Sequence, residues 1–294
     1  MSFAKTRSIV QEGDTVIIYV NPQAMYALQV KPLTATKKGD MVENIFQTAY
    51  GALKVQELVG KKFGHKVQFS RGWGYLLHPT PELWTLNLKH RTQILYTRDI
   101  SLIVMQLDLK AGSIVVESGI MQLMFNVHFK LLLFDTFILG TGSGSLSHAI
   151  LRAIAPTGHL YTFDFHQQRV EIVTQEFSDH GLEEFVTAKQ RDACKDGFDL
   201  EDAADAVFLD LPNPWLAIPH AVKSLKKSGK FFFCLLILGC LCIVLCKITF
   251  YNCQGEEYVL SLHVLSKLKR HVRVCWLKDS NTLRQWNVFR ENIK

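Results

Sequence analysis

The spacing of apolar residues along the chain changes at about residue 75. Before that point, short runs rich in Val, Ile, Tyr and Thr cover Thr15–Val20, Ala24–Val30 and Lys66–Ser70, and turn-forming Asn, Pro and Gly residues separate them. This pattern predicts a small antiparallel β domain over residues 1–75. After it, the run His78–Trp84 places prolines where a helix can begin, and leucines then recur near helical spacing.

Strands and helices alternate from about residue 113 onward. This alternation predicts an α/β domain over residues 76–231 with a parallel sheet, whose ligand loops lie at the carboxyl ends of the strands. The expected strands are Ser113–Ser118, Gly158–Phe163, Phe185–Gln190, Ala204–Leu209 and one opening at Gly229–Phe233. The expected helices are Leu146–Ala155, Gln167–His180 and Ile218–Leu225.

Composition narrows the class of protein only slightly. A hydrophobic fraction of 48% and a charged fraction of 20% are typical of a globular chain. The net charge of +6 is compatible with a polyanionic partner such as RNA but does not identify one. Met1–Asp14 has four charged residues and no apolar core, so we expect a cytosolic or nuclear protein. The spacing of the seven cysteines matches no zinc framework, and we expect no metal.

Two polar features favour a nucleoside-containing cofactor. The run Gly140–Ser145 holds three glycines before an expected helix, where backbone N–H groups can approach a ligand; a plain tight turn is the alternative. Asp164 ends the second expected strand, where a carboxylate can accept hydrogen bonds from both ribose hydroxyls. The alternative for Asp164 is the N-cap of the following helix.

Two further acids follow the next strands. Asp192, beside Ala193, ends the third expected strand and can meet an adenine amino group, or it is a solvated loop acid. Asp210 begins a loop that reaches Trp215 through two prolines. An acid beside an aromatic at a cleft mouth suits a planar amine substrate; a turn with a packed tryptophan is the alternative.

Several long runs resemble one family, the catalytic subunit of the eukaryotic tRNA (adenine-58-N1)-methyltransferase. They are His78–Tyr96, Ser143–Ala149, Ala155–Leu160, Phe165–Arg169 and Ala204–Asp210. The resemblance implies a class I, Rossmann-like methyltransferase domain preceded by the small β domain. It implies transfer of a methyl group from S-adenosylmethionine to N1 of adenine-58 in the tRNA T-loop. The family works in the nucleus as a heterotetramer with a related non-catalytic subunit.

The resemblance also implies a role for each site residue. Asp210 is expected to contact the target base and to stabilise the positive charge that grows on it. Asp164, where the family usually has Glu, is expected to bind the ribose with Arg169 nearby. The cofactor's methionine end is expected at Glu117, Gly142, Ser143, Gly144 and Ser145, and its adenine at Asp192 and Ala193, with Leu95 lining the pocket.

One departure from the family pattern falls inside the cofactor loop. In the family, the run ending at Gly119 leads directly into Thr141, whereas here residues 120–140, mostly apolar, intervene. One arrangement keeps Ser113–Ser118 as the first strand and places the insertion in a loop. The other replaces that strand with Asp135–Gly140 and loses Glu117. We favour the first, because Ser113–Ser118 keeps its connection to the preceding residues.

The second departure is the tail, residues 232–294. Phe231–Cys246 is apolar and short for a membrane span, and a basic stretch around Lys267–Arg273 follows. We expect a tail unrelated to the family's last helix and strands, with translated intron as the favoured origin of both stretches. An exposed sheet edge would result. An active tRNA methyltransferase is the leading hypothesis; a catalytically impaired tRNA- or partner-binding subunit and a membrane-attached protein are the alternatives.

Overall fold

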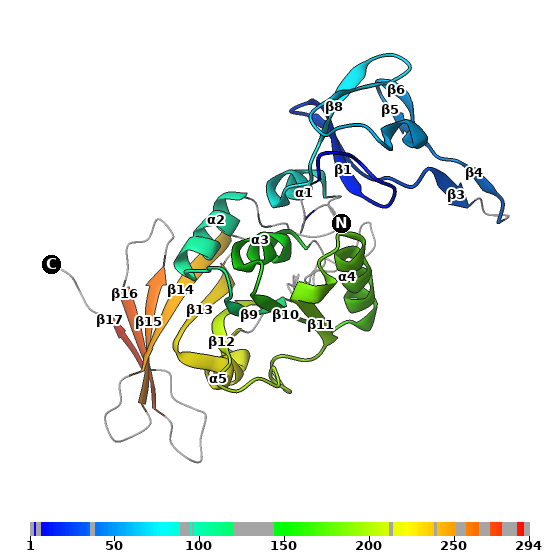
Figure 1. The fold of residues 1–294 in the computed structure, drawn as a ribbon. Helices are drawn as coiled ribbons and strands as arrows, with labels where there is room; N and C mark the ends of the chain where they lie inside the picture. Colours follow the sequence, from blue (N-terminus) through cyan, green and yellow to red (C-terminus); the bar gives the residue numbers. More distant parts are fainter. Residues whose placement is uncertain are drawn as a thin grey trace, which may run out of the picture.

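A computed structural model gives the architecture of two units, shown in Figure 1. Apart from Phe3 and Leu95, it describes residues 7–35, 39–88, 97–119, 144–211, 214–237, 240–250, 257–264, 271–277 and 287–290. Gly142 and Ser143, the insertion 120–140, and Pro212 and Asn213 therefore lie outside the described residues.

The N-terminal unit is an antiparallel β domain, as the pattern of short apolar runs predicts. Its main sheet has the order β2 (Ala24–Gln29), β1 (Thr15–Asn21), β8 (Trp73–Leu77) and β7 (Lys66–Gln68). Buried residues on the inner face include Val16, Ile18, Val67 and Leu76. Two hairpins and a short 3-10 helix complete the unit: β3 (Leu33–Ala35) with β4 (Met41–Glu43), β5 (Ile45–Thr48) with β6 (Gly51–Lys54), and η1 (Val55–Leu58).

The larger unit is built on a sheet whose first five strands are parallel. Among the described residues the order is β11, β10, β9, β12 and β13, followed by four more strands. The bounds are β9 Ile114–Gly119, β10 His159–Asp164, β11 Val186–Gln190, β12 Ala204–Asp210 and β13 Leu225–Ile237. The first four predicted strands agree with these bounds within one residue at either end.

Helices cover both faces of this sheet. The helices are α1 (Pro81–Asn87), α2 (Thr97–Gln106), α3 (Ser145–Ile154), α4 (Gln167–Asp179) and α5 (Pro214–Ser224), and a 3-10 turn η4 (Glu183–Phe185) precedes β11. Alternate residues of one strand serve the two faces: Val115 packs with α2, α3 and α4, whereas Val116 packs with α5. Both faces are therefore buried, as a parallel sheet requires.

The predicted helices form where capping and apolar spacing favour them. α1 begins at Pro81 behind Thr80, whose side chain accepts a hydrogen bond from the Leu83 N–H (3.3 Å). α3 and α4 match their predicted ranges closely, whereas α5 begins at Pro214 rather than at Ile218. The reason is that proline is well tolerated in the first turn of a helix, so the prolines after Asp210 do not delay its start.

The strand of the favoured arrangement around the insertion is confirmed, whereas the insertion itself lies outside the described residues. β9, which holds Glu117, lies between β10 and β12 and pairs in parallel with both. The alternative strand Asp135–Gly140 lies outside the residues that the structure describes.

The prediction of an exposed edge at β13 is wrong. β13 pairs antiparallel with β14 (Cys240–Phe250), and β15 (Glu257–Val264), β16 (His271–Leu277) and β17 (Asn287–Arg290) extend the same sheet. The apolar run Phe231–Cys246 is thus divided between two strands. A continuous apolar run has the same composition in a hairpin as in one long segment, so spacing alone does not distinguish them.

Within the described part of the chain, none of the helices has the length and apolar character needed to cross a membrane.

The tight start of β10 yields a stability prediction. Gly158 is buried, and a Cβ there would lie 2.6 Å from the Ile154 and Ser113 carbonyl oxygens. Because backbone atoms cannot move aside, Gly158→Ala should lower the free energy of unfolding by roughly 1–3 kcal/mol. Denaturant titration measures this. The matched control is Gly72→Ala, whose Cβ would meet its nearest atom at an ordinary 3.5 Å. Equal stability of the two variants would contradict the prediction.

Candidate active site

The strand register brings the predicted polar residues to one edge of the sheet. Asp210 of β12 stands opposite Gly119 of β9, and Asp164 of β10 stands opposite Gln190 of β11. Because these strands are parallel, their carboxyl ends meet at the same edge, where ligands bind in open α/β sheets. The strand ends that carry Asp164 and Asp210 therefore lie at one edge of the sheet, together with the end of β9.

Two acids with raised pKa values occupy this edge. Glu117 is 5% exposed, and its burial, together with the nearby charge of Asp210, raises its pKa to about 7. Burial also raises the pKa of Asp210 to about 6. A pair of desolvated carboxylates attracts cationic or amino groups, because such a ligand stabilises the ionised form that burial destabilises.

Ser147 holds Glu117 and is a residue that the sequence patterns missed. Its hydroxyl donates a hydrogen bond of 2.7 Å to a Glu117 carboxylate oxygen, and both side chains are buried. This bond ties the first turn of α3 to β9. Ser147 lies in α3, two residues after the end of the glycine loop. The packing of α3 on the sheet decides that its side chain points toward β9.

Asp164 and Arg169 lie together, as predicted. One Asp164 carboxylate oxygen accepts a hydrogen bond of 2.8 Å from the His166 N–H, and the other lies 3.6 Å from Arg169 Nη1. The N-cap of α4 is His166, so the alternative role of Asp164 as its N-cap is wrong. Arg169 Nη1 is buried and has no hydrogen-bond partner among the described residues. A buried guanidinium nitrogen without a partner, beside a carboxylate at a strand end, fits a polar ligand such as a ribose.

Asp192 and Ala193 form a turn directly after β11. The Cys194 N–H donates a 3.0 Å hydrogen bond to one Asp192 carboxylate oxygen, and Lys195 Nζ lies 3.5 Å from the other. Ala193 is 2% exposed and packs against the α5 face of the sheet. Asp192 is thus held by its own turn, with one carboxylate oxygen on the Cys194 N–H and the other beside Lys195.

Gly144 ends the glycine loop in a conformation that requires glycine. Its φ of +62° is left-handed, and a Cβ would lie 3.3 Å from the His148 ring. Ser145 begins α3 and is 1% exposed, and its hydroxyl contacts Thr85 and the Leu95 carbonyl. The predicted contact of Ser145 with a cofactor is therefore left to its backbone N–H, and Leu95 lies beside it.

A buried histidine pair, which sequence reasoning also missed, supports Gly144. The Gly144 carbonyl accepts a 2.6 Å hydrogen bond from His148 Nδ1, so neutral His148 must accept at Nε2 from His180 Nδ1, 2.8 Å away. Burial lowers the pKa of His148 to about 4 and lowers the pKa of His180 as well. Both imidazoles are therefore neutral at physiological pH.

The same pair, with Glu176, is a group with metal-ligand chemistry. The three donor atoms lie within 4.8 Å of one another. A zinc ion at about 2.05 Å from two nitrogens would hold them roughly 3.3 Å apart in tetrahedral geometry. The observed 2.8 Å separation is that of a direct hydrogen bond between the rings. The geometry is that of a structural pair joining α3 to the end of α4.

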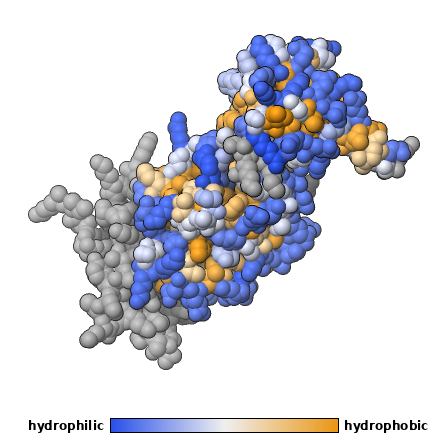
Figure 2. All heavy atoms as spheres, in the orientation of Figure 1, coloured by the Kyte–Doolittle hydropathy of each residue, from blue (hydrophilic) through white to orange (hydrophobic). Residues whose placement is uncertain are grey.

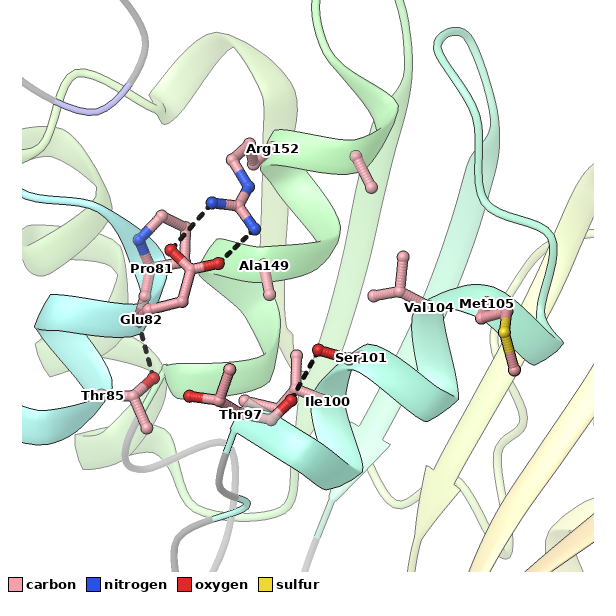
Figure 3. A pocket seen from close by; sticks show the side chains of 11 residues that line it. Pro81, Glu82, Thr85, Thr97, Ile100, Ser101, Val104, Met105, Ala149 and Arg152 are labelled. Carbon is pink, nitrogen blue, oxygen red and sulfur yellow. Dashed lines mark hydrogen bonds and ion pairs between the residues drawn. The ribbon is translucent and has the colours of Figure 1, made fainter.

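A hollow of about 260 Å³ lies among α1, α2 and α3 rather than at the strand ends (Figure 3). The pair Glu82–Arg152 spans it from α1 to α3, with Arg152 Nη1 2.9 Å from the Glu82 carboxylate. No strand residue lines this hollow. The hollow lies where α1 and α2 pack on α3, away from the strand ends that carry the predicted site residues.

The raised pKa of Glu117 predicts a pH-dependent cost to stability. The unfolded chain releases this proton near pH 4.5, whereas the folded protein holds it to about pH 7. Between these values the folded state binds more protons, so raising the pH lowers the free energy of unfolding. Glu117→Gln should remove this decline and gain roughly 2–3 kcal/mol over the wild type at pH 8, relative to their difference at pH 4.5.

The measurement is denaturant unfolding of both proteins at each pH. Only the difference between their free energies of unfolding isolates the contribution of Glu117. His148, with its lowered pKa, makes the free energy of unfolding rise with pH between pH 4 and 6.5 in both proteins. A difference that stays constant from pH 4.5 to 8 would contradict the raised pKa.

Comparison with known proteins gives this site its context. The family described as "tRNA methyltransferase complex GCD14 subunit" matches residues 72–123 and 135–271. The tRNA (adenine(58)-N(1))-methyltransferase catalytic subunit of Dictyostelium discoideum is 40% identical over 220 residues, which are 73% of this chain and 61% of that protein. The corresponding subunit of Schizosaccharomyces pombe is 39% identical, over 75% of this chain and 54% of its own length. The chain thus spans little more than half the length of these curated relatives.

Two solved structures resemble the whole fold. A SAM-dependent O-methyltransferase from Thermotoga maritima matches with a TM-score of 0.61 and 26% identity, over 78% of this chain and 74% of that one. The tRNA (m1A58) methyltransferase TrmI from Aquifex aeolicus matches with a TM-score of 0.57 and 20% identity, over 88% and 94% of the two chains. The second likeness is one of fold. The predicted class I methyltransferase fold is confirmed.

The family match corrects the two predicted departures. It continues past residue 231 to residue 271, so the prediction that the tail is unrelated to the family is wrong up to that residue. Its internal gap covers residues 124–134, a shorter stretch than the predicted insertion 120–140. Because the match includes more than half of its residues, the chain belongs to the family of tRNA methyltransferase complex GCD14 subunits.

Proposed function

We propose that this chain is the catalytic subunit of a tRNA methyltransferase, which transfers a methyl group from S-adenosylmethionine to N1 of adenine-58. The observation that carries the proposal is the pair of acids with raised pKa values, buried Glu117 and partly buried Asp210, at the carboxyl edge of the sheet beside Asp164. Relatives that are 34–40% identical carry the name of this activity. The Thermotoga neighbour, which shares the fold, is named as SAM-dependent.

Each acid has a distinct part in this proposal. S-adenosylmethionine, when bound, supplies an electrophilic methyl group on a positively charged sulfur. Glu117, held by Ser147, faces the cofactor's ammonium group, whose charge favours the ionised form of the carboxylate. Asp164 accepts hydrogen bonds from the ribose hydroxyls. Arg169 Nη1, which lacks a hydrogen-bond partner among the described residues, donates to the same part of the ligand.

Asp210 acts on the target base. Adenine N1 attacks as a neutral lone pair, so positive charge grows on the purine as the methyl group transfers. A carboxylate at the N6 amino group stabilises that charge and holds the ring in line with the methyl group. With a pKa of about 6, Asp210 is mostly ionised at pH 7.5 and can fill this role.

The N-terminal domain supports tRNA as the substrate. Residues 1–75 contain ten Lys and Arg residues and five Asp and Glu residues, so they carry five of the chain's six net positive charges. On one face of its sheet, Tyr19 stands opposite Tyr75, and Trp73 lies on the same face, 46% exposed. Lys66 Nζ lies 4.1 Å from the centre of the Trp73 ring. Exposed aromatic rings beside a lysine suit unpaired bases and phosphates.

The two hairpins of the N-terminal domain carry exposed apolar residues. Figure 2 shows apolar atoms interrupting the hydrophilic surface of the N-terminal domain. We assign the chain to a heterotetramer with a related non-catalytic subunit that shares the binding of tRNA, and to the nucleus. The name "complex subunit" of the family supports a partner. The exposed apolar residues of the hairpins are Leu33, Met41, Val42 and Ile45.

The experiment that tests the function is calorimetric titration of S-adenosylmethionine into the full chain, co-expressed with the related subunit. Saturable micromolar binding, followed by methylation of tRNA at N1 of adenine-58, is the expected result. A folded complex that binds no S-adenosylmethionine would overturn the proposal. The chain would then be interpreted as a catalytically impaired subunit that binds tRNA or its partner.

The role of Asp210 predicts a split between turnover and binding. Asp210→Asn keeps the shape of the side chain but removes its charge, so kcat should fall roughly 100-fold or more. The dissociation constant for S-adenosylmethionine should change by less than about threefold, because the loss falls on the transition state. Single-turnover kinetics and calorimetry measure the two quantities. Equal losses in both would refute the assignment.

The aromatic face predicts a separate effect on tRNA. Trp73→Ala should raise the KM for tRNA roughly tenfold, because one stacked base is worth about 1–3 kcal/mol. S-adenosylmethionine affinity should stay at the wild-type value. Val59→Ala is the matched control, since Val59 is an exposed apolar residue (37%) of the same domain outside its two hairpins. If both variants keep the wild-type KM, tRNA binds elsewhere.

A further inference from the structure

A chain of buried hydroxyl groups joins α1 to the start of α3. Thr85 Oγ1 lies 2.6 Å from Ser145 Oγ, and Ser145 Oγ lies 3.1 Å from the Leu95 carbonyl oxygen. Thr85 Oγ1 also lies 2.7 Å from the Pro81 carbonyl oxygen. Thr85 and Ser145 are 2% and 1% exposed, so water does not compete for these contacts.

The chain has fewer hydrogens than contacts. Each hydroxyl donates one hydrogen, and a carbonyl only accepts, so two hydrogens must serve three contacts. In one arrangement Thr85 donates to Ser145, and Ser145 donates to Leu95. In the other, Ser145 donates to Thr85, and Thr85 donates to Pro81. A third arrangement, in which both hydroxyls donate to carbonyls, leaves the two hydroxyl oxygens 2.6 Å apart with no hydrogen between them and is disfavoured by their repulsion. Of the other two, only the first gives the Leu95 carbonyl a hydrogen from Ser145.

The first arrangement is favoured by the backbone of α1. The Pro81 carbonyl lies in this helix, where the N–H four residues further on is its regular partner, so it loses little when Thr85 donates elsewhere. Unmade hydrogen bonds of buried groups are costly. Donation from Thr85 to Ser145 and from Ser145 to Leu95 is therefore the arrangement that loses the least hydrogen-bond energy.

This direction matters for the cofactor site proposed above. Ser145 is the first residue of α3 and follows Gly144 at the end of the glycine loop, and Leu95 packs beside it against the same core. α1 itself packs on α3, where Thr85 lines the hollow of Figure 3. Thr85 is the residue that connects α1, the first helix of the domain, to Ser145 and, through Ser145, to Leu95.

We propose that Thr85 is a positioning residue for S-adenosylmethionine binding, which acts by donating its hydrogen to Ser145 so that Ser145 donates to the Leu95 carbonyl. Thr85 does not touch the cofactor. It fixes the first residue of α3 and Leu95 in one relative position, at the end of the glycine loop where the cofactor is proposed to bind. The inference rests on the proposed function, because the cofactor is part of that proposal.

The test uses variants of the full chain with its subunit, and calorimetry of S-adenosylmethionine. Thr85→Val keeps the shape of the side chain and removes the hydroxyl. It should weaken S-adenosylmethionine binding about tenfold, the loss expected for one buried hydrogen bond, while the KM for tRNA stays within about twofold. Thr85→Ser keeps the hydroxyl and should bind within about threefold of the wild type.

A double-mutant cycle separates positioning from simple packing. In a Ser145→Ala background, Thr85→Val should add less than about twofold, because its effect passes through Ser145. Thr174→Val is the matched control: its hydroxyl, like that of Thr85, lies close to the carbonyl oxygen four residues earlier (2.6 Å), but on the exposed face of α4. It should leave binding unchanged.

Each outcome bears on one proposal. Wild-type affinity in Thr85→Val, or additive losses in the cycle, would overturn the role of Thr85. If Thr85→Val does not fold, Ser145→Ala alone tests the link, and wild-type affinity there overturns the proposal equally. Absence of binding by the wild-type complex would instead overturn the proposed function.

Discussion

The parallel pairing of β9 with both β10 and β12 is the constraint on which the rest of this site depends. It places Glu117, Asp164 and Asp210, which are up to 93 residues apart in the sequence, along one edge of the sheet. The pairing also buries Glu117 between two neighbouring strands. Since β9 lies in the centre of the parallel part of the sheet, a change in its register would move every polar group of the site. The structure retains this strand although residues 124–134, shortly after it, lie outside the family match.

Burial of the two acids costs stability and prepares the site for a cation. Each raised pKa means that the ionised carboxylate is less stable in the folded protein than in water. A ligand that brings an ammonium or an amino group reverses this penalty, so part of the folding cost returns as binding energy. Ser147 limits the cost by donating one hydrogen bond to Glu117. Such trade-offs between stability and function are typical of perturbed acids at active sites.

Much of this arrangement is predictable from the sequence because its signals are local. The glycine loop, the acid after each strand and the apolar runs all lie within a few residues of the feature that they report. The strands β9 to β12 were predicted within one residue for this reason. The role of Arg169 beside Asp164 came from the resemblance, and the structure brings the two side chains together.

The failures arise where information is not local. The apolar run after Phe231 was interpreted by its length, but the partner of each strand decides its structure, and that partner is another part of the tail. Ser147, Thr85 and the His148–His180 pair carry no sequence signal of their own, because each depends on helices packed against one another. Pairing between distant helices is set by the tertiary fold, which periodicity does not contain.

The support of α3 shows how such non-local contacts serve the site. Its N-terminus is held on one side by the hydroxyl chain through Ser145 and on another by His148, whose ring donates to the Gly144 carbonyl. A third contact, from Ser147 to Glu117, ties the same turn to β9. A helix end that binds a ligand through backbone N–H groups must not shift when the ligand arrives, since disorder there reduces affinity. Three buried polar contacts within one turn meet this need. Both imidazoles are neutral at physiological pH, so the turn is held without adding a positive charge beside the two acids that must attract one.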